Sequence, residues 1–173
     1  IEPFLKEDSY GLTPYMNTII FNHMDMYKEL THNLGGRVDI HKVFKIAIIM
    51  GRDKIISKLI SSGFSANIYL DDKYPIHSSI EYGHIKVTEV LLKNNSSLHL
   101  KNKDNYSAAD TYIKYLKNGI LDINDAKQLL KVFIKHQKSN LHLLLPSLII
   151  CSHEWLVDDL VSKCTDHLND IDN

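Results

Sequence analysis

A short pattern recurs along this chain at a nearly constant spacing. Asn22-His23, Gly51-Arg52 and Gly83-His84 each end seven residues before a leucine, and Ser152-His153 repeats the pattern further on. The first three copies are 29 and 32 residues apart, and the fourth follows after 69 residues, about two periods. A period of this length is typical of stacked helical units, each of which buries its apolar face against its neighbours. The spacing therefore predicts a repeat architecture.

The composition agrees with a folded intracellular protein. Of the 173 residues, 44% are hydrophobic, and the formal net charge of −1 gives no general attraction to nucleic acid or membrane. The longest apolar run, residues 143–151, contains Pro146 and is too short to span a bilayer. With only Cys151 and Cys164, a reducing compartment, cytoplasm or nucleus, is expected. Because the chain opens on Ile1, we expect it to be part of a longer protein.

The helical unit is clearest in the middle of the chain. The sequence predicts a short helix over residues 76–82, a break at Gly83-His84 and a second helix over 85–94. At the start, residues 8–11 predict a turn, and Thr13-Pro14 predicts a capped helix that runs to residue 21. A partner helix over residues 25–31 follows.

These residues resemble the ankyrin-repeat family, whose unit is a turn, a T-P-L-H segment and two antiparallel helices. The matching segments are 11–14, 75–77 with 83–84, Ala47 with Gly51, and 59–67. The resemblance implies an all-α ankyrin-repeat solenoid forming a single domain over residues 1–173, with residues 1–7 ending a preceding unit. The five repeat units expected are 8–36, 37–68, 69–100, 101–137 and 138–167.

Some units depart from the family pattern. The second has residues 42–45, Lys-Val-Phe-Lys, in place of T-P-L-H, and the fifth has residues 143–146 without a threonine cap. In the fourth, an insertion near residues 116–124 separates the helices, and Asp122 or Asn124 could cap the second one. Equivalent positions of the second helices are expected to form one buried seam: Leu30, Leu59, Leu91, Phe133 and Leu160.

The sequence contains no arrangement typical of catalysis, so we expect neither an enzyme nor a cofactor. Cys151, His153, Cys164 and His167 have the residue types of a zinc site, but their spacing is unusual, and ordinary structural roles are favoured. The resemblance implies that His23, His77, His84 and His153 bond neighbouring backbone. No metal is therefore expected.

The resemblance implies a binding surface along a concave groove. The two positions before each turn would face it: Ile20-Phe21, Ile49-Met50, Glu81-Tyr82, Lys114-Tyr115 and Ile150-Cys151. Residues at the tips of the finger turns would flank it: Tyr10, Leu12, Leu70, Asp71, Lys73, Asp104 and Tyr106. An exposed apolar stripe of this kind usually marks a partner site. The alternative is that irregular units tilt and bury part of it.

We therefore expect a protein–protein interaction module, the scaffold or adaptor part of a larger regulatory protein. The partner is predicted to be another protein, without nucleic acid or membrane, and the oligomeric state stays open. Three alternatives remain at this point. The first is a pathogen-encoded protein that targets a host factor, because the composition is similar to that of poxvirus ankyrin proteins. The second is self-association, and the third is the targeting domain of an enzyme.

Overall fold

The computed structural model describes residues 2–137. Over this range the fold is all-α, with eight α-helices packed in pairs and no strand. The helices are α1 (Pro14–Ile20), α2 (Met24–Leu34), α3 (Ile40–Ile49), α4 (Asp53–Ser61), α5 (Pro75–Glu81), α6 (Ile85–Lys93), α7 (Ala108–Lys117) and α8 (Ile123–His136). Two short 3-10 helices, η1 (Glu2–Phe4) and η2 (Gly35–Arg37), complete them. None of the described helices is long and apolar enough to cross a membrane.

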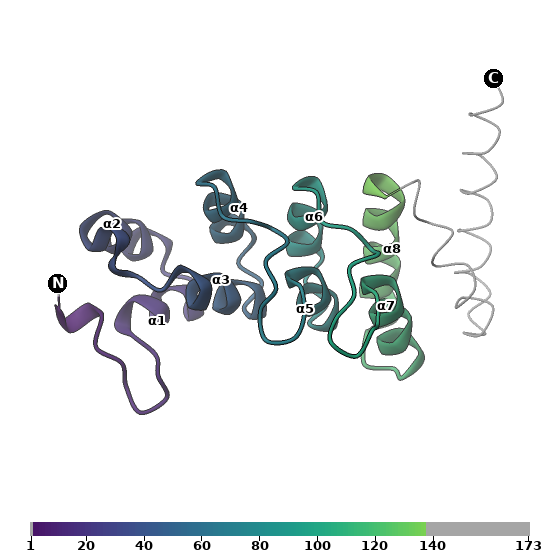
Figure 1. Cartoon of the computed structure of the whole chain (residues 1–173), viewed down its shortest axis with the longest axis horizontal. Helices are drawn as coiled ribbons and strands as arrows, with labels where there is room; N and C mark the ends of the chain where they lie inside the picture. Colours follow the sequence, from purple (N-terminus) through teal and green to yellow (C-terminus); the bar gives the residue numbers. More distant parts are fainter. Residues whose placement is uncertain (1, 138–173) are drawn as a thin grey trace, which may run out of the picture. The chain divides into compact units, whose positions relative to one another are not determined.

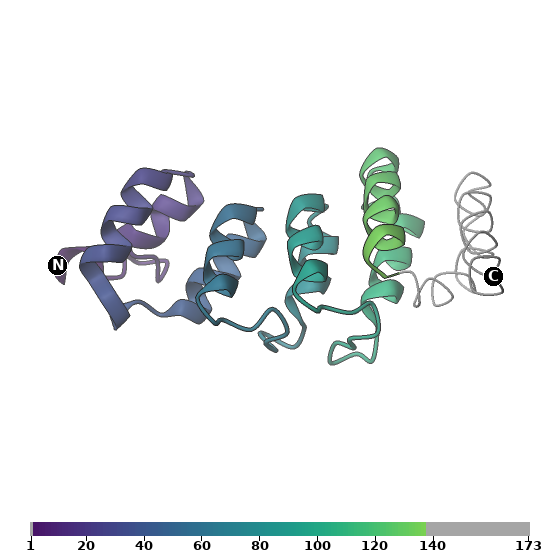
Figure 2. The same ribbon diagram turned by 90° about the horizontal axis from the view of Figure 1, so that it is seen from above.

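The chain divides after Phe64 into two compact bodies. In the N-terminal body, residues 2–64, α1 packs against α2 and α3, and α3 packs against α4 (Figure 1). In the C-terminal body, residues 65–137, α5 packs against α6 and α7, and α8 packs against α6 and α7. Within this second body the first helices of the two pairs lie side by side, and so do the second helices (Figure 2).

Short polar side chains set the starts of several helices. The Thr13 hydroxyl accepts a hydrogen bond from the Met16 backbone N–H at 3.2 Å, as the Thr13-Pro14 pair predicts. A capping box joins Ser107 and Asp110 at the start of α7. Of the two candidate caps for α8, the structure selects Asp122, whose carboxylate accepts from the N–H groups of residues 124 and 125.

The helix bounds follow the predictions within a residue for α1, α5 and α6, but α2 is longer than the predicted 25–31. The helix α2 runs on to Leu34, which is buried on the same face as Tyr27 and Leu30, and Gly35 ends it at a φ of 57°. The helix α3 starts at Ile40, because the Asp39 carboxylate caps it by accepting hydrogen bonds from the His41 and Lys42 N–H groups. The first helix of the second predicted unit therefore starts from an aspartate cap and not from a T-P-L-H segment.

One turn geometry recurs after the first helix of all four described pairs, and in the fourth it begins at Asn118 (φ −84°, ψ 3°) with Gly119 at a φ of 64°. In the first three pairs its first residue is Phe21, Met50 or Tyr82, with φ between −87° and −90° and ψ between 1° and 5°. The next residue has positive φ, namely Asn22 (60°), Gly51 (66°) or Gly83 (65°). The same backbone hydrogen bonds close each turn, for example His23 N–H to Thr18 O, Arg52 N–H to Ala47 O and His84 N–H to Ser79 O, each at 2.8 Å. The turn is therefore closed by main-chain hydrogen bonds and needs a residue that adopts positive φ at its second position.

The fourth pair has a longer connection. Residues 118–122 join α7 to α8, in place of three residues in the other pairs, so the predicted insertion is present but shorter than the range 116–124. Leu121 of this loop is buried, and Asp125 at the start of α8 approaches Gly83, where an added Cβ would lie 3.3 Å from the carboxylate. Glycine at position 83 thus serves both its positive φ and this close approach.

The predicted seam residues are buried as far as the structure describes them. Leu91 and Phe133 have no exposed surface, and Leu30 and Leu59 are 7% exposed, while Leu160 lies outside the described residues. The small residues Ala47 and Ser79 are also fully buried. The Thr88 hydroxyl donates to the Ser79 hydroxyl at 2.9 Å, which satisfies both polar groups between α5 and α6.

Candidate protein-binding surface

The N-terminal body carries an exposed apolar patch at the ends of α1 and α3. We call Ile20, Phe21, Ile49 and Met50 the N-terminal patch. Phe21 is 67% exposed and Met50 is 37% exposed, while Ile20 and Ile49 are half-buried. Phe21 and Met50 are the C-cap residues of α1 and α3, where the turns begin. The predicted alternative is burial of part of the row: Ile20 and Ile49 are partly covered, whereas Phe21 and Met50 are exposed.

Arg52 holds the two turns of this patch together. Its Nε donates to the Ile19 carbonyl at 2.9 Å, and its Nη2 donates to the Ile20 carbonyl. These carbonyls belong to the last turn of α1, where the helix leaves its C=O groups without intrahelical partners. The guanidinium therefore satisfies the end of α1 and connects it to the turn after α3.

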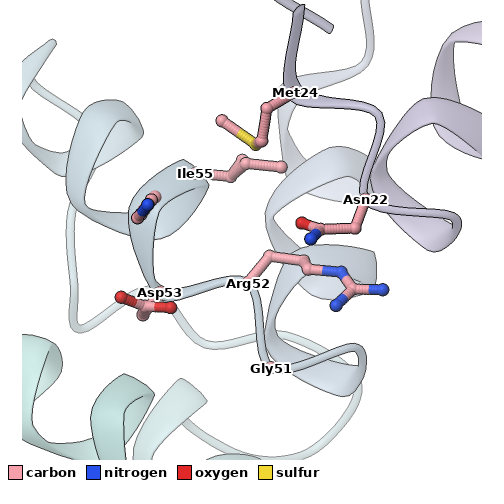
Figure 3. Close-up of a pocket in the computed structure, with 7 residues that line it drawn as sticks. Asn22, Met24, Gly51, Arg52, Asp53 and Ile55 are labelled. Atoms are coloured by element: carbon pink, nitrogen blue, oxygen red, sulfur yellow. The ribbon is translucent and has the colours of Figure 1, made fainter.

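A small hollow of about 160 Å³ lies beside Arg52. It is lined by Asn22, Met24, Gly51, Arg52, Asp53, Lys54 and Ile55. Figure 3 shows Met24 and Ile55 at one end and Asn22 with Arg52 at the other. Pockets for drug-sized ligands are usually about 300–1,000 Å³. This hollow suits at most one side chain of a partner, and the sequence analysis did not single it out.

A second hollow, of about 210 Å³, lies between the helix pairs of the same body. Its lining includes Tyr15 and Tyr27, whose ring centroids are 5.5 Å apart, and the Tyr15 hydroxyl bonds that of Thr31 at 2.9 Å. Burial raises the pKa of Tyr15. The tyrosine is thus a neutral core residue with its hydroxyl satisfied, not a reactive phenolate.

The C-terminal body carries a tyrosine patch. We call Tyr82, Tyr106 and Tyr115 the C-terminal patch. Tyr82 is 51% exposed and its ring stacks on that of His84, with centroids 5.9 Å apart. Tyr115 is half-buried, and its hydroxyl bonds the Glu81 carboxylate. Burial raises the pKa of Tyr115, and the Glu81 charge raises it further.

Glu81 links three elements of this body. Its carboxylate forms an ion pair with Lys73, in the finger turn before α5 (residues 70–73), and accepts from Tyr115 of α7. The Glu81 side chain is only 15% exposed. Glu81 and Lys73, both predicted as surface residues, therefore neutralise each other's charge within the body. The Glu81 carboxylate also holds the Tyr115 hydroxyl.

The remaining predicted residues lie in the finger turns before α1, α5 and α7, which are residues 8–12, 70–73 and 102–106. Lys114 lies over the Tyr106 ring, with Nζ 4.8 Å from the centroid, and Tyr106 is 42% exposed. Lys103 joins the two finger turns of this body, since its Nζ lies 2.6 Å from an Asp72 carboxylate oxygen. Asp71 and Asp104 are exposed and Leu70 is half-buried. In the N-terminal body, Tyr10 is 87% exposed and Leu12 is half-buried.

Two features of the fourth pair differ from the expected row. Lys114 and Tyr115 lie inside α7, which continues to Lys117, so they are one helical turn before the turn itself. The loop after α7 exposes Ile120, which is 61% accessible and was not among the predicted residues. The predicted insertion near residues 116–124 could have indicated an exposed apolar residue in this loop. Ile150-Cys151, the fifth pair of the predicted row, lies outside the described residues.

His77, within α5, has the structural role predicted for it. His77 is fully buried, and its Nε2 lies 3.2 Å from the Tyr106 carbonyl, to which it donates. Burial lowers the pKa of His77, and the bonds to the Tyr106 and Tyr74 carbonyls oppose this shift in part. Among residues 2–137 no cluster of His, Cys, Asp or Glu side chains is suited to hold a metal. The zinc candidates, Cys151, His153, Cys164 and His167, lie beyond residue 137.

Comparison with known proteins adds no assignment. No protein-family model matches the chain, and no curated protein matches its sequence. The ankyrin resemblance therefore rests on the residues quoted above.

Proposed function

We propose that this chain is an ankyrin-type repeat stack that binds another protein through the N-terminal and C-terminal patches. One observation carries the proposal. Phe21, Met50 and Tyr82 occupy the same backbone position in three successive helix pairs, and each is exposed. Large apolar side chains at one repeated, solvent-accessible position are typical of a protein-binding surface.

The repeated turn supports the ankyrin interpretation independently of the exposed side chains. The helix–turn–helix pairs share backbone angles, positive-φ residues and closing hydrogen bonds, although their sequences differ. Repeat proteins of this kind most often act by presenting a variable surface on a constant scaffold. No catalytic step is needed for this function.

The energetics favour a binding role for the patches. Since the turns are closed by their own main-chain hydrogen bonds, the side chains of Phe21 and Met50 are not needed to hold them. Covering their apolar surface by a partner would contribute about 25 cal/mol for each Å² removed from water, before the costs of association. Their removal should therefore weaken a complex more than it weakens the fold.

The test is a double substitution, Met50→Glu with Tyr82→Glu, which places one charge in each patch. Partners captured by the intact chain from cell extract are quantified against this variant and then measured individually with purified protein. We expect the double variant to lose binding while its helicity and thermal midpoint stay close to those of the parent. Met26→Glu is the matched control, because Met26 is a methionine of α2 that is 53% exposed and belongs to neither patch.

Two results would contradict the proposal. The first is unchanged affinity of the double variant for every captured partner. The second is equal loss of binding in the Met26→Glu control. If the double glutamate variant unfolds, Met50→Ser with Tyr82→Ser removes the apolar surface without adding charge, and the same comparison applies.

A further inference from the structure

Tyr10 lies in the finger turn before α1, and at 87% it is the most exposed large hydrophobic residue in the described part of the chain. Its backbone is held in place, because its N–H donates to the Asp8 carboxylate at 2.8 Å. Within residues 2–137, its ring and hydroxyl have no hydrogen-bonding, ring or ionic partner. The phenol is therefore open to solvent on a closed turn.

The chain has nine tyrosines, and the other eight all lie in the described part and are held in the fold. Three are buried, two use the hydroxyl in a hydrogen bond, and three have the ring against a histidine or lysine side chain. In that order they are Tyr15, Tyr27 and Tyr112; Tyr69 and Tyr115; and Tyr74, Tyr82 and Tyr106. An enzyme that acts on a tyrosine hydroxyl would thus reach Tyr10 without breaking a side-chain contact.

The backbone around Tyr10 can be engaged without unfolding a helix. Residues 5–13 lie between η1 and α1 and belong to neither. The Asp8 carboxylate also accepts from the Leu12 N–H at 2.9 Å, and the Asp8 N–H donates to the Leu12 carbonyl at 2.8 Å. Exposed loop tips open at a low cost in free energy, so enzymes act on them more readily than on helices of a folded chain.

Acidic residues precede Tyr10 along the chain. Glu7 and Asp8 are both exposed, and Glu7 forms an ion pair with Lys42 of α3 at 2.7 Å. Together with Lys6, residues 6–12 carry one positive and two negative charges, which is a formal net charge of −1. An enzyme with a basic substrate groove is steered to such a segment by complementary charge. The segment thus combines an accessible hydroxyl with acidic residues before it.

We propose that Tyr10 is a phosphorylation site, modified by a tyrosine kinase that recognises acidic residues before the acceptor. The Tyr10 hydroxyl oxygen attacks the γ-phosphorus of ATP and forms a new P–O bond. The bond from the γ-phosphorus to the β,γ-bridging oxygen breaks, ADP leaves, and the phenolic proton passes to a carboxylate base of the kinase. The product adds a charge of about −2, which takes residues 6–12 from −1 to about −3.

This change of charge alters what the finger turn can contact. A phosphate beside Glu7 and Asp8 repels acidic partners, and it attracts arginine and lysine side chains, which bind phosphate through charge-assisted hydrogen bonds. The inference goes beyond the proposed function and does not depend on it, because the modification needs neither the N-terminal patch nor the C-terminal patch.

The test uses the full chain, Mg²⁺, ATP and the purified catalytic domain of a non-receptor tyrosine kinase that prefers acidic residues before the acceptor. Phosphate at each tyrosine is quantified by mass spectrometry of peptides at early time points. We expect Tyr10 to carry more phosphate than all other tyrosines together. Tyr10→Phe keeps the ring and removes the hydroxyl, so it should remove most of the incorporation while the thermal midpoint stays unchanged.

Three charge variants test how the segment is recognised. Glu7→Gln should lower the initial rate at Tyr10 about threefold or more, through lost charge complementarity. Glu29→Gln is the matched control on an exposed residue of α2, outside the segment, and should change the rate less than about 1.5-fold. Lys42→Gln breaks the same ion pair but keeps the Glu7 charge, so it should not lower the rate.

Three results would overturn the inference. The first is absence of phosphate from Tyr10. The second is a rate at Tyr82, which is 51% exposed, that equals or exceeds the rate at Tyr10. The third is an effect of Glu29→Gln or Lys42→Gln as large as that of Glu7→Gln. Each of these leaves the proposed function standing, since no binding partner enters the assay.

Discussion

Leu91→Ala is the sharpest test of how the C-terminal body is packed. Leu91 has no exposed surface, and its helix α6 packs against α5 and α8. The substitution removes three carbon groups at about 0.8 kcal/mol each, or about 2.4 kcal/mol of transfer free energy. The remaining cavity adds to this, so the free energy of unfolding should fall by about 2–5 kcal/mol.

The assay is urea unfolding at 25 °C, followed by far-UV circular dichroism and by tyrosine fluorescence. The Leu91 carbonyl accepts from the N–H groups of Asn94 and Ser96, and the substitution leaves these backbone bonds in place. The change therefore reports side-chain packing. Val90→Ala on the same helix is the control, because Val90 is half-buried, and it should cost about 1 kcal/mol or less. A loss below about 1 kcal/mol for Leu91→Ala would refute the assigned seam.

Three further predictions concern caps and ionisable groups. Asp122→Ala should lower the stability of the C-terminal body by about 1 kcal/mol through loss of the α8 cap, and Asn124→Ala, measured by the same urea midpoint, should have a smaller effect. Contacts with Lys135, Lys93 and His136 lower the pKa of Glu89 to about 2 from its ordinary 4.5, so its stabilisation is complete above pH 4.5 and is lost as pH falls towards 2. Glu89→Gln should flatten this acid limb of the stability curve, and an unchanged limb would contradict the ion cluster. Burial lowers the pKa of His77, so the unfolded chain takes up a proton first and stability should fall as pH drops below 6.5. The slope in this window, measured by urea midpoints at successive pH values, should be smaller in His77→Gln than in the parent.

Local signals made the turns and three of the helices predictable. Thr13-Pro14 gives a cap and a preset φ, and Gly51 and Gly83 supply the positive φ that the turn requires. Asn22 provides the same conformation, since Asn is among the residues that tolerate it. These features depend on a few adjacent residues, so they can be recognised in a sequence.

Features that depend on distant residues were not predictable in the same way. Arg52 donates to the carbonyls of Ile19 and Ile20, more than 30 residues earlier. Glu81, predicted as a surface residue, is largely buried by its contacts with Lys73 and Tyr115. Such pairings depend on how the helix pairs dock, which a single sequence does not encode locally. The exposure of Phe21, Met50 and Tyr82, which the ankyrin resemblance implies, agrees with the structure.

The recurring turn has a consequence for how this surface can change over generations. Because its closing hydrogen bonds come from the main chain, the residue that begins it can be Phe, Met or Tyr without altering the backbone. Exchanges among large side chains at positions 21, 50 and 82 should thus leave the buried residues undisturbed. If these positions bind a partner as proposed, single-codon changes there could alter which partner is bound with no compensating change in the interior.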